Sequence, residues 1–208
     1  MKTDTIFYRL FQSFPSIFFE LIQLPATEAN NYSFDSVEVK QLSFRIDGIF
    51  LPQNNNPHVP IYFCEVQFQK DDDFYGRFFA EISSYLSQTE LTNDWRGVII
   101  YPNRRVDTDN IQRYRDMLTS GRVTRLYLDE LENLNQSSIG LATVQLITLP
   151  EAEAIDVTRQ LIQRVRNELT SDQKPEELLQ LIETVLVYML PRLSRREVEA
   201  MFSLDELN

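Results

Sequence analysis

YFCEVQFQK, residues 62–70, is an apolar stretch that carries a carboxylate near its centre. Side chains of a β-strand alternate between the two faces of a sheet, so Glu65, Gln67 and Gln69 share one face. The other face carries Tyr62, Cys64, Val66 and Phe68. Because burying unpaired polar groups is costly, this polar row indicates a face with a function.

A second strand is predicted shortly before this one. VKQLSFRIDGIFL, residues 39–51, alternates between apolar and polar residues, with Asp47 on the polar face. The turn-forming residues PQNNNPHVP between the two stretches predict a hairpin, in which Asp47 and Glu65 can converge. A plainer alternative is that Asp47 and Gly48 form a turn dipeptide and that Glu65 faces water.

The rest of the chain predicts an α/β domain with a helical extension. The order of elements is helix, hairpin, helix, strand, helix, strand and then helices, which predicts a mixed sheet flanked by helices. Helices are expected over residues 4–23, with a break at Pro15, over 71–91 and over 107–118. Strands are expected over 96–102, 122–128 and 140–149, and a loop is expected over 25–36. The predicted boundary separates a domain over 1–150 from a helical extension over 151–208, in which Ser194 begins a capping box.

Composition excludes several classes of protein. The chain has 208 residues, of which 43% are hydrophobic, and this indicates a folded globular protein. Cys64 is the single cysteine, which excludes an internal disulfide framework and a cysteine-based zinc site. His58 is the single histidine and lies in a predicted loop, which disfavours a Ser-His-Asp triad. Charged residues interrupt the apolar N-terminal region, and no stretch has the roughly 18 apolar residues of a membrane span. These features predict a cytoplasmic protein without a membrane partner.

The charge of the chain is unevenly distributed. The net charge is −11, which disfavours long-range attraction to nucleic acid or to an anionic membrane. Residues 96–125 nevertheless contain seven arginines and three aspartates, a local net charge of +4. This segment is either an ordinary solvated surface or a basic strip that contacts phosphate.

Asp47 and Glu65 suggest a metal site. A hard divalent ion such as Mg²⁺ binds a few carboxylate and carbonyl oxygens and keeps several waters. Two carboxylates and the backbone carbonyl of Val66 would suffice, with Mn²⁺ as an alternative ion. Such an ion activates a water and neutralises charge on a phosphate, and Gln67 could orient that water.

The pair RIDG and CEVQ, residues 45–48 and 64–67, resembles the motif of the PD-(D/E)XK nuclease superfamily. The runs FRIDGIFLP, YFCEVQFQKDDDFYGRFFAEISSYL, DWRGVIIYP and LSRREVEAMFSLDEL resemble, more closely, a bacterial family common in cyanobacteria. That family is grouped with transposases and recombination-promoting nucleases of the Rpn type. The resemblance covers about residues 4 to 205 and implies a restriction-endonuclease-like core.

The resemblance also implies roles for individual residues. Asp47 and Glu65 match the acids that bind metal, whereas Gln67 stands where the superfamily usually has lysine. Glutamine can orient a water but cannot supply a positive charge. Glu20, on the first helix, matches loosely an accessory acid, although an ordinary exposed glutamate is an equally good interpretation. The superfamily further implies a homodimer and a setting in transposition or recombination.

Two hypotheses follow from the sequence. The first is a Mg²⁺-dependent DNA endonuclease in which Tyr75, Arg77, Arg104 and Arg105 contact DNA phosphates. The second is a catalytically degenerate nuclease fold that acts as a binding or assembly module. The glutamine at position 67 and the acidic net charge both favour the second hypothesis.

Overall fold

A computed structural model describes the chain over residues 3–39, 44–54, 56–131, 137–170 and 173–202. For residues 36–39 and 44–47 only the backbone is described. The chain forms two compact units, one from residues 14–130 and one from residues 1–13 together with 131–208. This division differs from the predicted boundary at residue 150, because the first helix and residues 131–150 belong to the helical unit.

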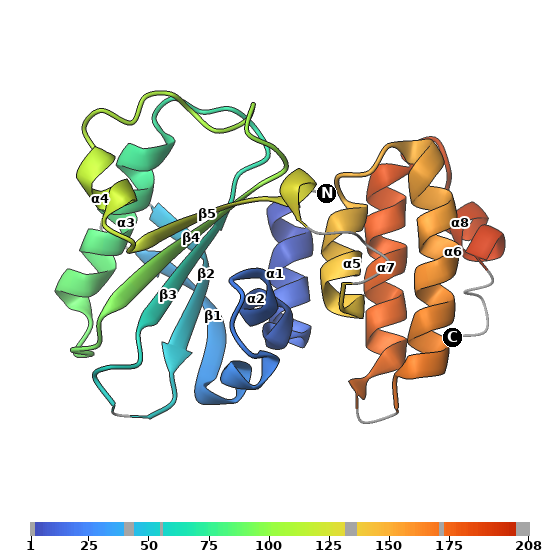
Figure 1. Ribbon diagram of the computed structural model, residues 1–208, viewed down its shortest axis with the longest axis horizontal. Coiled ribbons are helices and arrows are strands. Elements are labelled where there is room, and N and C mark those ends of the chain that lie inside the picture. Colours follow the sequence, from blue (N-terminus) through green and yellow to red (C-terminus); the bar gives the residue numbers. More distant parts are fainter. Residues whose placement is uncertain (1–2, 40–43, 55, 132–136, 171–172, 203–208) are drawn as a thin grey trace. The chain divides into compact units, whose positions relative to one another are not determined.

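The unit over residues 14–130 contains a five-stranded mixed sheet (Figure 1). The strands follow one another across the sheet in chain order. The first three strands are antiparallel neighbours, whereas β3, β4 and β5 run parallel to one another. The bounds are β1 Tyr32–Val39, β2 Phe44–Pro52, β3 Ile61–Val66, β4 Trp95–Tyr101 and β5 Val123–Tyr127. The predicted hairpin of β2 and β3 is confirmed.

β1 corrects one expectation from the sequence. Residues 25–36 read as a polar loop, but β1 begins at Tyr32 and pairs along β2 as an edge strand. The earlier part of that segment is a 3-10 helix, η1 (Ala26–Asn31). The ring of Tyr32 explains the strand, because it is buried 5.0 Å from the ring of Phe19 and anchors a segment that is otherwise polar.

The pairing of β1 with β2 contains a register shift. Asp35 pairs with Ile49, but Val37 pairs with Ile46, so one position of β1 faces two positions of β2. This is the count of a β-bulge, and the two positions involved are Asp47 and Gly48. β-Bulges are frequent beside functional sites because they redirect the strand locally.

Helices cover both faces of the sheet. Helix α2 (Pro15–Leu21) packs the Phe18 ring 4.0 Å from the Phe50 ring and 5.5 Å from the Tyr62 ring. Helix α3 (Phe74–Gln88) covers the other face with a core that includes Phe63. These contacts fix the faces: residues in step with Phe63 face α3, and residues in step with Tyr62 face α2.

The connection from β4 to β5 is largely irregular. A helix was expected over residues 107–118, but the helical part is α4 (Arg115–Thr119) alone. Residues 102–114, which leave the carboxyl end of β4, form turns and bends. The expectation failed because Asp107 and its neighbours make tertiary polar contacts, described below, in place of a helix.

The amino-terminal ends of β4 and β5 are joined through Asp94. Its carboxylate accepts hydrogen bonds from Arg96, at 2.7 Å, and from Arg122, whose guanidinium lies 5.5 Å from the Trp95 ring centroid. Burial raises the pKa of Asp94, but the hydrogen bonds from Arg122 and Arg96 outweigh burial and lower it to about 2. The carboxylate is therefore charged across the neutral range.

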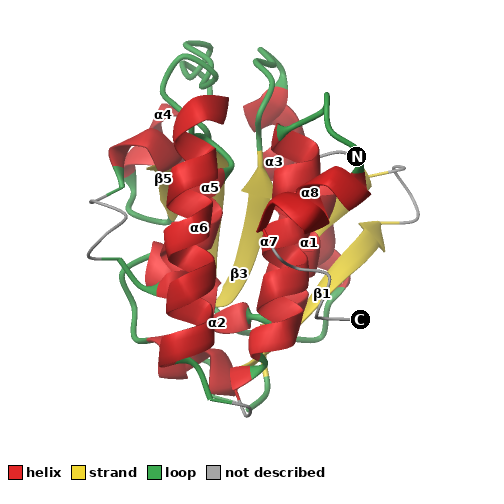
Figure 2. Cartoon of the chain, turned by 90° about the vertical axis from the view of Figure 1, so that its right-hand side faces the viewer, coloured by secondary structure: helices red, strands yellow, loops and turns green. Residues whose placement is uncertain are grey.

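The second unit is built from helices, and Figure 2 shows α6 and α7 side by side. Contacts link α1 with α7, α5 with α6, and α7 with α8. Its helices are α1 Thr3–Ser13, α5 Ile139–Leu146, α6 Glu151–Glu168, α7 Pro175–Met189 and α8 Arg195–Phe202. Thr3 on α1 shares a hydrogen bond of 3.0 Å with the Tyr188 hydroxyl on α7. In the part of the chain that is described, no helix combines the length and apolar character needed to cross a membrane.

Two details of the helical unit test the sequence prediction. The strand expected over residues 140–149 is wrong, because this apolar segment forms α5, capped by Ser138, whose hydroxyl accepts from the Leu141 amide at 3.2 Å. The capping box at the start of α8 is confirmed. The Ser194 amide donates to Glu197 at 2.7 Å, and the Glu197 amide donates to the Ser194 hydroxyl at 3.4 Å.

Candidate functional site

The carboxyl ends of β3, β4 and β5 lie together at one edge of the sheet. Glu65 on β3 pairs with Ile99 on β4, and Ile99 pairs with Arg125 on β5, so the three residues form a row across the sheet. Residues paired directly in a parallel sheet point to the same face, and Ile99 belongs to the core beneath α3. Glu65 and Arg125 therefore share the α3 face. In α/β sheets this edge is where ligands usually bind.

Asp47 lies at the β-bulge of β2. Gly48 pairs with Cys64 across β3, so the predicted site residue occupies the position just before a described pair. A Cβ at Gly48 would lie 3.0 Å from Cε2 of Phe34, which shows how closely the neighbouring ring covers this backbone. The side chain of Asp47 lies outside the described residues, so its contacts are not part of the description.

Gln67 follows the end of β3 and continues its pairing. The Gln67 amide donates to the Ile100 carbonyl at 2.9 Å, which holds its backbone beside β4. Its side-chain amide nitrogen donates to the Gln69 carbonyl. Glu65, Val66 and Gln67 are all half-buried, unlike the fully buried residues that precede them in β3. The polar end of this strand is therefore accessible to a small ligand.

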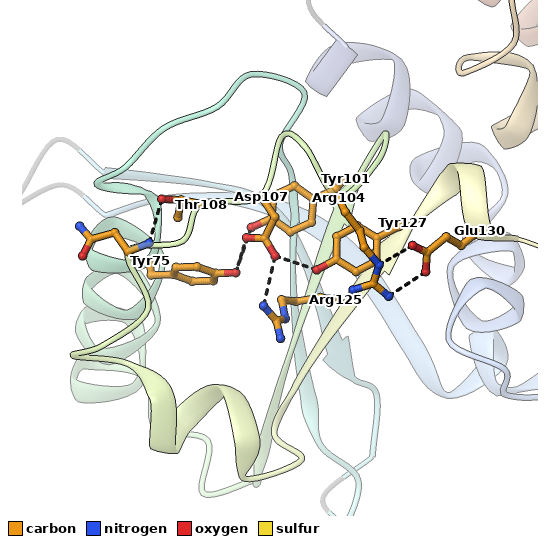
Figure 3. A network of polar contacts seen from close by, with 9 residues as sticks. Tyr75, Tyr101, Arg104, Asp107, Thr108, Arg125, Tyr127 and Glu130 are labelled. Atoms are coloured by element: carbon orange, nitrogen blue, oxygen red, sulfur yellow. Dashed lines mark hydrogen bonds and ion pairs between the residues drawn. The ribbon is translucent and has the colours of Figure 1, made fainter.

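Asp107, which sequence reasoning missed, is the centre of a polar network at the same edge (Figure 3). Its Oδ1 accepts from the Tyr75 hydroxyl at 2.7 Å, and its Oδ2 accepts from the Tyr127 hydroxyl at 2.7 Å. Oδ2 also accepts from Nη1 of Arg125 at 3.1 Å. The Asp107 side chain is only 10% exposed. A buried carboxylate is thus stabilised by three donors.

The tyrosines of this network are kept protonated. Burial is the main cause that raises the pKa of Tyr75, Tyr101 and Tyr127 above the usual value, and the charge of Asp107 raises each further. The Tyr101 hydroxyl donates to the Tyr75 hydroxyl at 3.3 Å. At neutral pH these hydroxyls therefore stay protonated, and those of Tyr75 and Tyr127 donate hydrogen bonds to Asp107.

The loop that carries Asp107 is tied to the start of α3. The Thr108 hydroxyl donates to the Asp72 carboxylate at 2.8 Å, and the Asn110 side chain donates to the Asp72 carbonyl at 3.1 Å. A pocket of about 250 Å³ opens where the loop meets α3. Its lining is Asp72, Asp73, Gly76, Arg77, Asn110, Arg113 and Tyr114. This lining contains two acids and two bases, so the pocket has no strong preference for one charge.

The four predicted phosphate contacts have different surroundings. Tyr75 is fully buried and bonded to Asp107, which does not fit a role at the surface, because the ring is part of the core. Arg77 is paired with Asp71. Arg104 donates from Nη2 to Glu130 at 2.8 Å and lies 4.2 Å from the Tyr127 ring centroid. Arg105 is exposed.

Glu20 is half-buried in α2. The described contacts of α2 are with the face that carries Tyr62, whereas alternation places Glu65 on the α3 face. This arrangement does not favour the predicted role of Glu20 as an accessory acid beside Glu65. Among the described residues, no three histidine, cysteine, aspartate or glutamate side chains gather as a metal cluster.

Arg125 and Asp107 are the site residues that the sequence did not single out. Arg125 appeared only as one arginine of the segment 96–125, and Asp107 fell within a helix that does not form. A usable signal existed, because Asp107 stands in the connection that leaves the buried strand RGVIIYP. Polar residues in such connections lie at the ligand-binding edge of a parallel sheet.

The chain belongs to the family described as protein of unknown function DUF2887, whose model matches residues 3–202. The match includes the sheet unit and the helical unit, so both are features of the family. No curated protein and no solved structure matches the chain significantly.

Proposed function

We propose that this chain is a metal-dependent DNA endonuclease with a restriction-endonuclease-like core, in which Asp47 and Glu65 hold the metal ion. One observation carries the proposal. The described pairs of β2 and β3 include Ile49 with Phe63 and end at Gly48 with Cys64, and one further step of that antiparallel register would set position 47 opposite position 65. Residues directly opposite in an antiparallel pair have Cβ atoms about 4.5–5.5 Å apart. Two carboxylates at that spacing can share one cation.

The chemistry of the available donors fits a hard divalent cation. Asp47 and Glu65 offer carboxylate oxygens, and Val66, the last residue of β3, offers a backbone carbonyl. Glu65 is half-buried, which limits competition from bulk water while leaving room for the waters that Mg²⁺ retains. Mg²⁺ or Mn²⁺ in this place would lower the pKa of a bound water and neutralise charge on a phosphodiester.

The residues of the chain would orient the reactants. The Gln67 backbone is fixed to β4 through the Ile100 carbonyl, so its side chain starts from a defined position on the face of Glu65. The oxygen of the Gln67 side-chain amide can accept a hydrogen bond from the attacking water and hold it in line. Glutamine supplies no charge, so a cation on the protein must contact the phosphate from another position.

The proposed partners follow from the same chemistry. DNA is the proposed substrate, a homodimer would allow both strands of a duplex to be cut, and the family resemblance suggests transposition or recombination. A net charge of −11 requires that any contact with DNA be local, through the arginines of residues 96–125. Arg104 and Arg105 are the exposed members of that segment nearest to the carboxyl end of β4.

A cleavage assay and a metal-binding assay together test the proposal. Supercoiled plasmid is incubated with the purified chain in Mg²⁺, in Mn²⁺ and in EDTA, beside the isosteric variants Asp47→Asn and Glu65→Gln. Asp156→Asn, which removes an exposed carboxylate of the helical unit, is the matched control. In parallel, the thermal midpoint of each protein is measured with and without Mn²⁺.

Metal-dependent cutting that Glu65→Gln loses and Asp156→Asn keeps is the expected result. At a Mn²⁺ concentration of 100 times Kd, binding should stabilise the native chain by about 2.7 kcal/mol, and this gain should disappear in Glu65→Gln. If there is neither cutting nor a rise in thermal midpoint with metal, the nuclease proposal is wrong. The absence of a positive charge at Gln67 would then favour a binding or assembly module.

A further inference from the structure

The proposed metal site has no positive charge left over to offset the negative charge of a phosphate. Two carboxylates, at positions 47 and 65, balance the two positive charges of a divalent cation. Gln67 is neutral, so a phosphodiester arriving at this site brings a negative charge that none of these groups offsets. Hydrolysis spreads further negative charge over the phosphate oxygens. A productive site therefore needs a positive side chain nearby.

The sheet register places a cation in the row of Glu65. Glu65 pairs with Ile99, and Ile99 pairs with Arg125, so Arg125 stands two strands away on the same face. Two strand spacings amount to about 10 Å between the backbones of positions 65 and 125. The row between them is occupied by Ile99, which is fully buried and presents no competing polar group. A phosphate group coordinated at Glu65 would lie above this row.

The Arg125 guanidinium is held in place and is partly open to solvent. Nη1 donates to Oδ2 of Asp107 at 3.1 Å, and the side chain of Arg125 is 34% exposed. Asp107 is itself fixed by Tyr75 and Tyr127, so the contact gives the guanidinium a defined location (Figure 3). A guanidinium has five N–H donors, and bidentate binding of a phosphate needs two of them. The contact with Asp107 is therefore compatible with a second anion.

We propose that Arg125 binds the substrate phosphate at the carboxyl edge of the sheet, across the row from Glu65, with Asp107 as its positioning residue. The proposal rests on the proposed nuclease function, and it assigns the phosphate contact to a residue of β5. Arg104 and Arg105 are less suitable, because the first is paired with Glu130 and stacked on Tyr127, and the second lies outside the sheet.

The test measures DNA binding separately from cleavage. A short fluorescein-labelled duplex of mixed sequence is titrated with the full chain in Ca²⁺, at several salt concentrations, by fluorescence anisotropy. Wild type is compared with Arg125→Gln and with Arg159→Gln, which removes a guanidinium that is also paired with an aspartate, in the helical unit. Cleavage in Mg²⁺ and the thermal midpoint with Mn²⁺ are measured on the same proteins.

Loss of one phosphate contact lowers the slope of log K against log salt by roughly 0.9 for duplex DNA. We expect this decrease in Arg125→Gln, together with a loss of cleavage of roughly 100-fold, the scale for one transition-state donor. The response of the thermal midpoint to Mn²⁺ should not change, since Arg125 is not a metal ligand. Arg159→Gln should match wild type in all three measurements.

Two results would overturn the inference in distinguishable ways. If wild type binds and cuts DNA, and Arg125→Gln matches it in slope and rate, Arg125 does not contact the phosphate and the nuclease proposal stands. If wild type neither binds the duplex nor cuts it, both proposals fail. Should Arg125→Gln not fold, Arg125→Lys decides: the salt slope is kept and cleavage falls about tenfold if bidentate contact matters, whereas an unchanged rate overturns the inference.

Discussion

Replacing Asp107 by asparagine tests whether the polar network holds the carboxyl edge of the sheet together. The substitution keeps the shape of the side chain but removes its charge and turns one acceptor oxygen into a donor nitrogen. Oδ2 accepts from both Tyr127 and Arg125, so the amide oxygen is expected to take that place. The amide nitrogen then faces Tyr75, whose hydroxyl already accepts from Tyr101.

The cost follows from the contacts that weaken. Two hydrogen bonds lose the contribution of a charged acceptor, and the donation from Tyr75 loses its acceptor in a site that is only 10% exposed. Hydrogen bonds to charged groups contribute about 1.5–3 kcal/mol and neutral ones about 1 kcal/mol, so Asp107→Asn should destabilise the sheet unit by about 2–3 kcal/mol. Alanine at this position should cost more, because the buried hydroxyls of Tyr75 and Tyr127 would then both lose their acceptor.

Urea denaturation measures this difference. Trp95 is the single tryptophan and lies in the sheet unit, so its fluorescence reports on that unit, while circular dichroism follows both units. Asp156→Asn is the control, because its pair with Arg159 is 78% exposed on the aspartate side and should contribute less than about 0.5 kcal/mol. A cost for Asp107→Asn as small as that of the control would refute the reasoning.

Three other substitutions test separate contacts. Gly97→Ala should destabilise the sheet unit by about 1–3 kcal/mol in the same urea assay, because the new Cβ would lie 2.9 Å from Cζ of the buried Phe78; no measurable cost would contradict the packing. The lowered pKa of Asp94, about 2, means that its contribution to stability is present above pH 4 and lost as pH falls from 4 toward 2. Asp94→Asn should flatten the pH dependence of the thermal midpoint in that window, and an unchanged slope would argue against the contact. Ser194→Ala should cost about 1 kcal/mol, because the Ser194 hydroxyl caps α8 by accepting from the Glu197 amide. Amide hydrogen exchange at the start of α8 should become faster, and Ser194→Thr, which keeps the hydroxyl, should restore both values.

Several parts of the fold were predictable because their signals are local. The alternation in residues 62–70 identified β3, and the turn residues before it identified the hairpin with β2. Pro15 ended the first helix, as expected of a residue that cannot donate its amide. In each case the pattern lies within one short segment, so the information needed was present in that segment.

Other parts depended on contacts that no local pattern encodes. Residues 140–149 are mostly apolar and include several β-branched side chains, and a largely buried helix cannot be distinguished from a buried strand by periodicity. The cap at Ser138, a local signal, was the feature that could have decided the matter. β1 was missed because it is an edge strand with several polar residues, so its sequence resembles a loop and only its pairing with β2 identifies it.

Only part of the candidate site could be predicted from the sequence. Glu65 could be singled out from the sequence because a carboxylate in an apolar strand is unusual. The structure confirms that Glu65 lies on a strand, β3. Asp107 could not be found in this way, because its partners Tyr75 and Tyr127 are separated from it by 32 and 20 residues. The row from Glu65 to Arg125 likewise exists only once β4 lies between their strands.

The path of the chain between its units has a consequence for synthesis on the ribosome. Helix α1 is made before the sheet unit, but its partner α7 begins at Pro175, about 160 residues later. At a synthesis rate of 5–20 residues per second, α1 is without α7 for roughly 8–30 s. The sheet unit, contiguous from Phe14 to Glu130, can fold during this interval. Helix α1 lacks its partner α7 until then, so an isolated sheet unit is best produced from a fragment that begins at Phe14.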